Sequence, residues 1–182
     1  MRRVMAMVSA AAFVLATTSV YAQGAAASFN GKWTRDMPAG GGGGAAGGGG
    51  GGGRGGGGRG GFGGGGGFQC NPSCTLTVTA ANLKLERPAG QDGTVPPALN
   101  FKLDGSDSSN PGRMGQDGTP GPAVISKAKW DGNKIVISTT RDFQGQSITS
   151  TQTLSVEGGK LTVVTTSSME GAQPQTATYT KG

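Results

Sequence analysis

The alternation of apolar and polar residues across positions 123–168 predicts a run of antiparallel β-hairpins. Three turn signals separate the alternating segments, namely Asp131-Gly132-Asn133, Gln144-Gly145 and Glu157-Gly158-Gly159. Glycine and asparagine favour such turns because they adopt positive φ at low cost. The region is therefore predicted to form a four-stranded meander.

Each turn fixes a strand register independently of the others, because residues directly opposite each other lie on one face of the sheet. The first turn pairs Trp130 with Ile135, the second pairs Ile135 with Leu154, and the third pairs Leu154 with Val163. All three registers place the same residues on the same face, and a slip of one residue would move a strand's apolar set to the other side. The opposite, solvated face carries mainly basic and hydroxyl side chains: Lys127, Lys129, Ser138, Thr140, Thr149, Thr151, Thr153, Ser155, Thr162, Thr166 and Ser168.

The inner face contains a polar band beside its apolar end. Buried hydroxyls and amides are costly without partners, so the band either faces solvent at an open mouth or lines a wet cavity. Barrel mouths are common ligand sites, whereas ordinary polar strand ends account for the same residues without a ligand. The candidate ligand-pocket residues are Ser126, Thr139, Arg141, Ser150, Gln152, Thr165 and Ser167.

Shorter alternating segments add further strands to the same sheet. Residues 29–35 place Phe29 and Trp33 on one face, residues 76–78 and 83–85 form a hairpin around Asn82, and residues 99–103 and 176–181 continue the pattern. We therefore predict an all-β fold, an antiparallel up-and-down meander of about eight or nine strands that closes into a small barrel.

Residues 1–22 have the pattern of a secretory signal peptide, with Arg2 and Arg3 before an apolar run and a small-residue site at Ala22. We predict cleavage after Ala22 and export to the periplasm or the extracellular medium, with no stable membrane insertion afterwards. The alternative is an uncleaved membrane anchor, because residues 4–22 carry no charge.

Residues 38–68 form a glycine-rich insertion, with 23 glycines in positions 40–67. Such a segment has few side chains to bury and loses much entropy on ordering, so we predict that it is disordered. It follows a lead and first strand in residues 23–37 and precedes the remainder of a single β domain in residues 69–182. The alternatives are an RNA-binding segment with Gly-Arg-Gly units and a surface-association role.

Cys70 and Cys74 flank the turn-forming residues Asn71, Pro72 and Ser73. In an oxidising compartment such a pair most simply forms one local disulfide. A redox-active pair has two intervening residues rather than three, and a metal site would need further ligands.

The chain contains no histidine, which excludes the Ser-His-Asp triad, the Cys-His pair and the usual zinc sites. Residues 104–110 resemble a calcium-binding loop, but they lack the glutamate that ends such a loop, and an Asx-rich turn is the alternative. Paired carboxylates could serve a saccharide hydrolase, although Asp104, Asp131, Glu157 and Glu170 occupy turn positions. We predict no enzymatic activity, no cofactor and no metal site.

The net charge of +6 says little about partners, because four of the 16 basic residues lie in the leader and the glycine-rich tract. The remaining part has 12 basic and 10 acidic residues, and we predict no nucleic-acid partner. No protein partner is identifiable, which leaves a small ligand or an envelope component.

Three blocks resemble a family of small exported bacterial lipocalin-like β proteins: residues 103–110, residues 126–137 and residues 151–155. Gly31-Lys32-Trp33 also resembles the G-x-W motif in the first strand of lipocalins. The resemblance implies export and a β-barrel, and it supplies no functional residue. The sequence thus predicts a non-catalytic exported β-barrel module with a structural or weak small-ligand-binding role.

Overall fold

The structure is a computed structural model that describes residues 18–36, 67–91, 93–112, 119, 121–143 and 145–182. These residues form one α-helix and ten β-strands. All ten strands belong to a single antiparallel sheet. The elements are α1 (Thr18–Phe29), β1 (Gly31–Arg35), β2 (Ser73–Val78), β3 (Asn82–Glu86), β4 (Leu99–Lys102), β5 (Asp104–Asn110), β6 (Val124–Asp131), β7 (Lys134–Phe143), β8 (Gln146–Glu157), β9 (Lys160–Ser167) and β10 (Gln175–Lys181).

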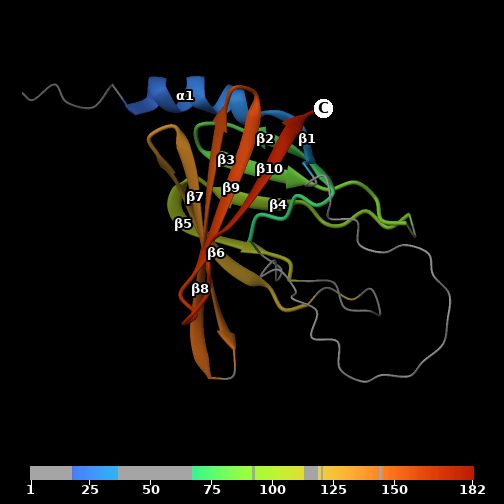
Figure 1. The fold of residues 1–182 in the computed structure, drawn as a ribbon, viewed down its shortest axis with the longest axis vertical. Helices are drawn as coiled ribbons and strands as arrows, with labels where there is room; N and C mark the ends of the chain where they lie inside the picture. Colours follow the sequence, from blue (N-terminus) through green and yellow to red (C-terminus); the bar gives the residue numbers. More distant parts are fainter. Residues whose placement is uncertain (1–17, 37–66, 92, 113–118, 120, 144) are drawn as a thin grey trace, which may run out of the picture.

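The strands follow one another around a nearly closed barrel (Figure 1). Every hydrogen-bonded neighbour is also a neighbour in sequence, except that β1 pairs with β10 and so joins the two ends of the chain. The hydrogen-bonded order begins at β4 and ends at β5, and the single residue Leu103 links these two strands. The predicted all-β up-and-down meander is confirmed, and the structure has ten strands rather than eight or nine.

Side chains close the seam between β4 and β5. The amide of Asn110 accepts a hydrogen bond from the backbone N–H of Asn100 (2.7 Å) and donates one to the carbonyl of the same residue (2.9 Å). Two residues further along β4, the N–H of Lys102 donates a hydrogen bond to the Ser108 hydroxyl of β5 (2.9 Å). These bonds replace part of a missing backbone ladder, and they satisfy backbone groups that would otherwise lose their partners.

The predicted registers of the meander are confirmed. Trp130 pairs with Ile135, Ile135 with Leu154, and Leu154 with Val163. The predicted hairpin around Asn82 is also present, as β2 and β3. The turn glycines Gly132, Gly145, Gly158 and Gly159 all have positive φ, as their turn types require.

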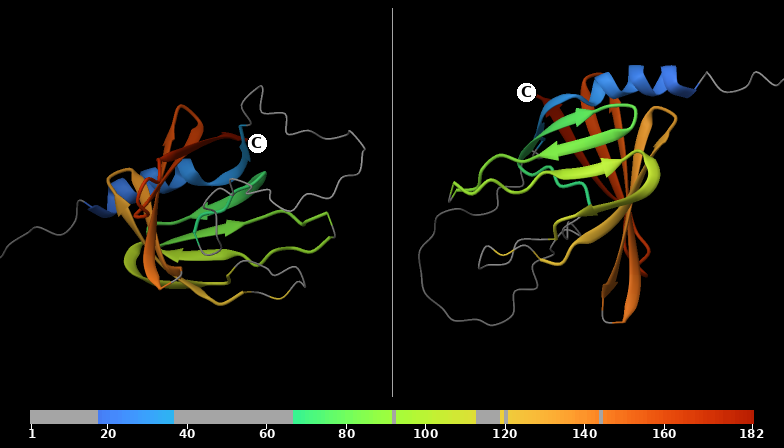
Figure 2. Two further views of the ribbon diagram at one scale, coloured as in Figure 1. Left: turned by 60° about the horizontal axis from the view of Figure 1, so that its bottom comes forward. Right: turned by 180° about the vertical axis from the view of Figure 1, so that it is seen from behind.

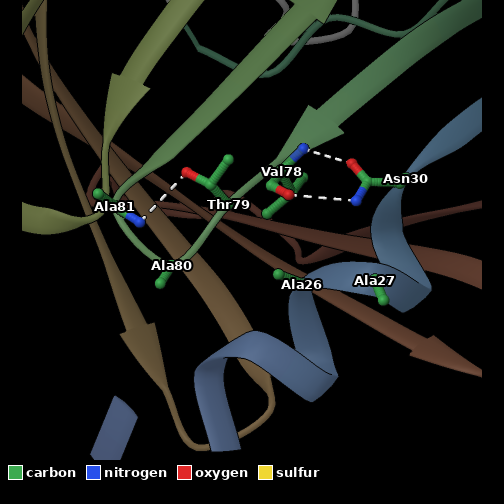
Figure 3. Close-up of a pocket in the computed structure, with 7 residues that line it drawn as sticks. All are labelled: Ala26, Ala27, Asn30, Val78, Thr79, Ala80 and Ala81. Carbon is green, nitrogen blue, oxygen red and sulfur yellow. Dashed lines mark hydrogen bonds between the residues drawn. The ribbon is translucent and has the colours of Figure 1, made fainter. Parts of the chain in front are cut away.

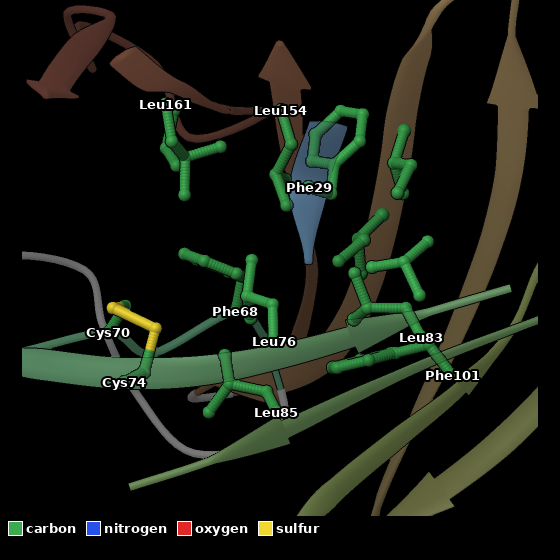
Figure 4. Close-up of a cluster of buried hydrophobic side chains, with 14 of the residues drawn as sticks. Phe29, Phe68, Cys70, Cys74, Leu76, Leu83, Leu85, Phe101, Leu154 and Leu161 are labelled. Atoms are coloured by element: carbon green, nitrogen blue, oxygen red, sulfur yellow. A yellow bond between two sulfur atoms is a disulfide. The ribbon is translucent and has the colours of Figure 1, made fainter. Parts of the chain in front are cut away.

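Helix α1 lies across one end of the barrel, which we call the closed end (Figure 2). Its last residue, Phe29, is fully buried and packs edge-on against Trp130, with ring centroids 5.9 Å apart. The Phe29 carbonyl also accepts a hydrogen bond from the indole of Trp33 (2.8 Å). The apolar core extends from this end through the barrel and includes the Cys70–Cys74 disulfide (Figure 4).

Two local expectations are wrong. Phe29 ends a helix and β1 begins only at Gly31, whereas the sequence analysis placed both in one strand. Residues 104–110 form a strand with a register shift rather than an Asx-rich turn, although Asp104 makes an Asx-type bond to the N–H of Ser106 (2.9 Å) at that shift. The inward-facing positions of this strand are occupied by the polar residues Ser108 and Asn110, whose side chains hydrogen-bond to β4. The strand therefore lacks the apolar alternation that the other strands have.

Most of the predicted signal peptide and glycine-rich insertion lies outside the described residues. Within the described part, no helix is long and apolar enough to span a membrane. Gly67 and Phe68, which the sequence analysis assigned to the insertion, are described and buried. The part of the β domain that follows the insertion therefore begins before residue 69.

Candidate functional site

The segment Gly67-Phe68-Gln69, here called the strap, crosses the interior near the end of the barrel opposite α1, which we call the mouth. The amide of Gln152 on β8 accepts a hydrogen bond from the N–H of Phe68 (2.6 Å) and donates one to its carbonyl (3.1 Å). A Cβ at Gly67 would lie 2.6 Å from Oε1 of Gln152 and 3.7 Å from the Thr139 hydroxyl. A side chain at this position would therefore displace the Gln152 oxygen from its hydrogen bond with Phe68.

The strap is also held at its other end. The side-chain oxygen of Gln69 accepts a hydrogen bond from Arg87, which follows β3 (3.1 Å). The next residue, Cys70, forms the predicted disulfide with Cys74 on β2. Phe68 packs edge-on against Tyr179 at a centroid distance of 6.3 Å. The strap therefore connects β8 to the opposite side of the barrel.

Four of the candidate-pocket residues already have side-chain hydrogen bonds. Ser126 and Thr139 are buried, and their hydroxyls are hydrogen-bonded to each other (2.8 Å). Gln152 holds Phe68, and the Ser167 hydroxyl accepts a hydrogen bond from the N–H of Met169 (3.2 Å). The sequence analysis placed these residues on one inner surface, but the bonds between them and the strap were not predicted.

The side chains of three other candidate residues have no hydrogen-bonding partner among the described residues. Arg141, Ser150 and Thr165 are partly exposed, and their side chains form no hydrogen bond or ion pair with a described residue. Thr139 pairs with Ser150, and Arg141 is two residues further along β7, so the guanidinium and hydroxyl are diagonal neighbours on one face. Partial burial lowers the pKa of Arg141 from its usual value, because the charged form is partly removed from water. The mouth thus presents a charged donor and hydroxyls above the strap.

The sequence analysis did not identify Arg87 as part of the mouth. Burial lowers its pKa, and its guanidinium also contacts the carbonyl of Pro97 (3.4 Å). Its Nε–H is buried and has no acceptor in the described part of the chain. The signal was present in the sequence, because Arg87 has the same parity as the inward-facing Leu83 and Leu85.

The carboxylates in the described part of the chain do not form a catalytic pair in the mouth. Glu86 pairs with Lys84, Asp107 with Lys127 and Asp36 with Lys160, all through partly exposed side chains. No group of three or more histidine, cysteine or acidic residues with the geometry of a metal site occurs among the described residues. The saccharide-hydrolase alternative therefore gains no support from these positions.

An open groove of about 440 Å³ lies outside the barrel, between α1 and the β2–β3 hairpin (Figure 3). Its lining is made mostly of alanine side chains, and its two polar side chains are already engaged. Asn30 bonds to both backbone groups of Val78, and the Thr79 hydroxyl accepts from the N–H of Asn82 (3.0 Å). The groove therefore has few free polar groups to orient a ligand.

Comparisons with known proteins give no family assignment. No protein-family model matches the sequence, and no curated protein matches it significantly. Among solved structures, the crystal structures of wild-type fluorescent protein UnaG and of one of its point mutants are each 19% identical with a TM-score of 0.42. Each match covers 60% of this chain, and 72% and 70% of the wild-type and mutant chains respectively. Because the likeness is this low, the site must be argued from its own residues.

Proposed function

We propose that this protein is an exported, non-catalytic β-barrel module that binds a small ligand weakly at its mouth. The observation that carries the proposal is a set of polar side chains on one inner surface beside the strap that have no partner among the described residues, namely those of Arg141, Ser150 and Thr165. Partial burial weakens the hydration of such groups, and a ligand with complementary atoms would restore the lost hydrogen bonds.

The packed interior favours a ligand position in the mouth over one in the centre of the barrel. Phe29, Trp33 and Phe101 are each at most 1% exposed, and they fill the space below the strap together with the aliphatic core. A ligand in the mouth would rest on the strap and remain open to solvent on its outer side. Binding should therefore be weak, because a ligand gains less when a smaller share of its surface is buried.

Export is supported by the signal-like residues 1–22 and by the Cys70–Cys74 disulfide, since disulfides persist mainly in oxidising compartments. The non-catalytic part of the proposal rests on the absence of histidine from the whole sequence. It also rests on Glu86 and Asp36 near the mouth, whose carboxylates are engaged in ion pairs on the outer surface.

The test combines ligand discovery with site mapping. Native mass spectrometry of the protein purified from the envelope of its own host should show a small molecule bound to the folded chain. Its addition to ¹⁵N-labelled protein should shift the amide signals of Arg141, Ser150 and Thr165 more than those of the closed end. Shifts confined to the groove beside α1, or no retained or added molecule that binds at all, would contradict the proposal.

A pair of matched variants separates a mouth site from a general effect on the barrel. Thr165→Val removes one inner hydroxyl with little change in volume, and Thr162→Val makes the same change on the outer face of β9. We expect weaker binding only for Thr165→Val. Equal effects of the two substitutions would indicate that the hydroxyl does not contact the ligand.

A further inference from the structure

Three strands carry an arginine and an acidic residue side by side at the mouth. The pairs are Arg35-Asp36 at the end of β1, Glu86-Arg87 at the end of β3, and Arg141-Asp142 near the end of β7. Neighbouring residues in a strand point to opposite faces, so each pair must separate its two charges between the inside and the outside.

In all three pairs the arginine lies two residues after a buried, inward-facing residue and is therefore on the inner face of its strand. Arg35 follows the buried Trp33 by two residues, Arg87 follows Leu85, and Arg141 follows Thr139. The strands thus place three positive residues on the inner register of the same end. Arg87 and Arg141 are also partly buried, whereas Arg35 is exposed.

The three acidic partners instead bond on the outer surface. Asp36 accepts a hydrogen bond from the Thr180 hydroxyl (2.7 Å) and pairs with Lys160 at 3.8 Å. Glu86 pairs with Lys84 at 2.8 Å, and Asp142 accepts a hydrogen bond from the Ser147 hydroxyl (2.9 Å). None of the three arginines forms an ion pair with a described carboxylate. Glu170, on the exposed β9–β10 loop at the same end, has no ion pair with a described residue either.

The two partly buried arginines have no counter-charge in an ion pair within the described part of the chain. Arg87 contacts two neutral oxygens, those of Gln69 and Pro97, and its buried Nε–H has no described acceptor. The guanidinium of Arg141 has no hydrogen-bonding partner among the described residues. A guanidinium presents several N–H donors in a fixed plane, which match the oxygens of a carboxylate or phosphate group.

We propose that the mouth is an oxyanion site in which Arg141 binds a carboxylate or phosphate group of a small ligand, with Arg87 and Arg35 adding positive potential. This inference rests on the proposed function, and it specifies the chemical class of the ligand. The hydroxyls of Ser150 and Thr165 would donate to the remaining oxygens of the same group. Conversion of either hydroxyl to a hydrocarbon should weaken binding less than loss of the guanidinium, because charge-assisted hydrogen bonds are the stronger ones.

The experiment compares charged and neutral probes of the same shape on the full exported chain. Butyrate, butyramide and inorganic phosphate are titrated at low ionic strength into ¹⁵N-labelled protein, and the amide and arginine Nε–H signals are followed. Butyrate or phosphate should shift the signals of Arg141 and Ser150, whereas butyramide should bind at least about tenfold more weakly. Added salt should weaken the binding of the anions.

Variants identify the group that binds. Arg141→Gln should weaken anion binding by about tenfold or more, and Arg141→Lys should restore part of it because the charge returns without the planar fork. Lys129→Gln removes the same charge from the exposed outer face and should change binding little. Circular dichroism and thermal unfolding confirm that each variant is folded before it is titrated.

The outcomes separate the class of ligand from the existence of the site. Binding of butyrate but not phosphate would identify an organic acid, and the reverse would identify a phosphate-bearing ligand. Equal binding of butyrate and butyramide at the mouth would overturn the oxyanion inference and leave the proposed function standing. If no probe binds and the host-purified protein also carries no mouth ligand, both proposals fail.

Discussion

The side chain of Gln152 pairs with the backbone of Phe68 as a neighbouring strand would, accepting from its N–H at 2.6 Å and donating to its carbonyl at 3.1 Å. Asn110 does the same for Asn100 at the seam, and Asn30 does so for Val78 beside α1. A primary amide presents an N–H donor and a carbonyl acceptor side by side in one plane, so it can replace a backbone peptide where the sheet lacks a strand. Side-chain amides thus replace missing backbone partners at three places in the described part of the barrel.

Replacement of Gln152 by glutamate should destabilise the protein near neutral pH. The carboxylate can still accept from the Phe68 N–H, but it cannot donate to the Phe68 carbonyl, and two oxygens would then face each other. We expect a loss of about 1–3 kcal/mol in the free energy of unfolding, the usual cost of a buried unsatisfied polar group. Urea unfolding at neutral pH measures this loss.

The same variant should show a characteristic pH dependence. The folded state would prefer the protonated glutamic acid, which can donate again, so the pKa of the new side chain would be raised on folding. The destabilisation should therefore shrink as the pH falls toward the ordinary range of glutamic acid and persist above it. Gln146→Glu, at an exposed position on the same strand, is the control and should show neither effect.

The two asparagines at the seam should respond differently to substitution, because the side chain of Asn110 bonds to the backbone of Asn100. Asn110→Ala removes a side chain that is 2% exposed and leaves the N–H and C=O of Asn100 without partners. We expect a loss of about 2–4 kcal/mol, since two backbone groups become unsatisfied. Asn100→Ala removes only an exposed side chain and should change the free energy of unfolding by less than about 0.5 kcal/mol.

Hydrogen exchange tests the location of the seam effect. In the Asn110→Ala variant, the amides of Asn100 and Lys102 should exchange faster than in the parent protein, while those of the β7–β8 ladder should be unchanged. Uniformly faster exchange would instead indicate a global loss of stability, and the side-chain seam would then not be a local closure.

Gly67 should tolerate no side chain. A Cβ there would lie 2.6 Å from the Gln152 oxygen, and that oxygen can retreat only by breaking its bond to Phe68. Gly67→Ala should therefore lower the free energy of unfolding by about 1–3 kcal/mol. Gly24→Ala is the contrasting variant, because a Cβ in α1 at that position meets no atom within 4 Å. It should be neutral or stabilising by up to about 1 kcal/mol, and equal losses in both variants would contradict the proposed contact.

The sequence predicted the meander because two independent signals agreed there. The turn glycines fixed the loop positions, and the period-two alternation around Trp130 and Leu154 fixed the registers. The spacing between Phe29 and Trp33 was ambiguous by contrast, because residues four apart share a face in a helix as well as in a strand. In the structure, Phe29 is the last residue of α1 and packs against Trp130.

The parts that the sequence did not predict depend on long-range polar contacts. Strand β5 has no apolar alternation, and it is held by the inward side chains of Ser108 and Asn110. The strap depends on contacts between Phe68 and Gln152, which are 84 positions apart. Local sequence propensity contains no information about the contacts of β5 or of the strap. The inner-face position of Arg141 could be predicted, because Arg141 lies in the register that the meander turns define.

Tyr179 should make stability fall at alkaline pH. Burial raises the pKa of its phenol, and the charge of Arg35 opposes this shift only in part. A pKa that is higher in the folded state means that the neutral form is favoured by folding. This contribution is fully present below the ordinary tyrosine pKa of about 10 and is lost as the pH rises through the higher folded value.

Tyr179→Phe provides the measurement, because phenylalanine keeps the ring beside Phe68 and cannot ionise. Urea midpoints of the two proteins should be compared from about pH 8 to about pH 11, across the ordinary tyrosine pKa. The parent protein should lose more stability than the variant over this interval, so that the difference between them appears only at the alkaline end. Parallel curves would show that the phenol of Tyr179 is as well solvated in the folded barrel as in the unfolded chain, which the 5% exposure of this residue argues against.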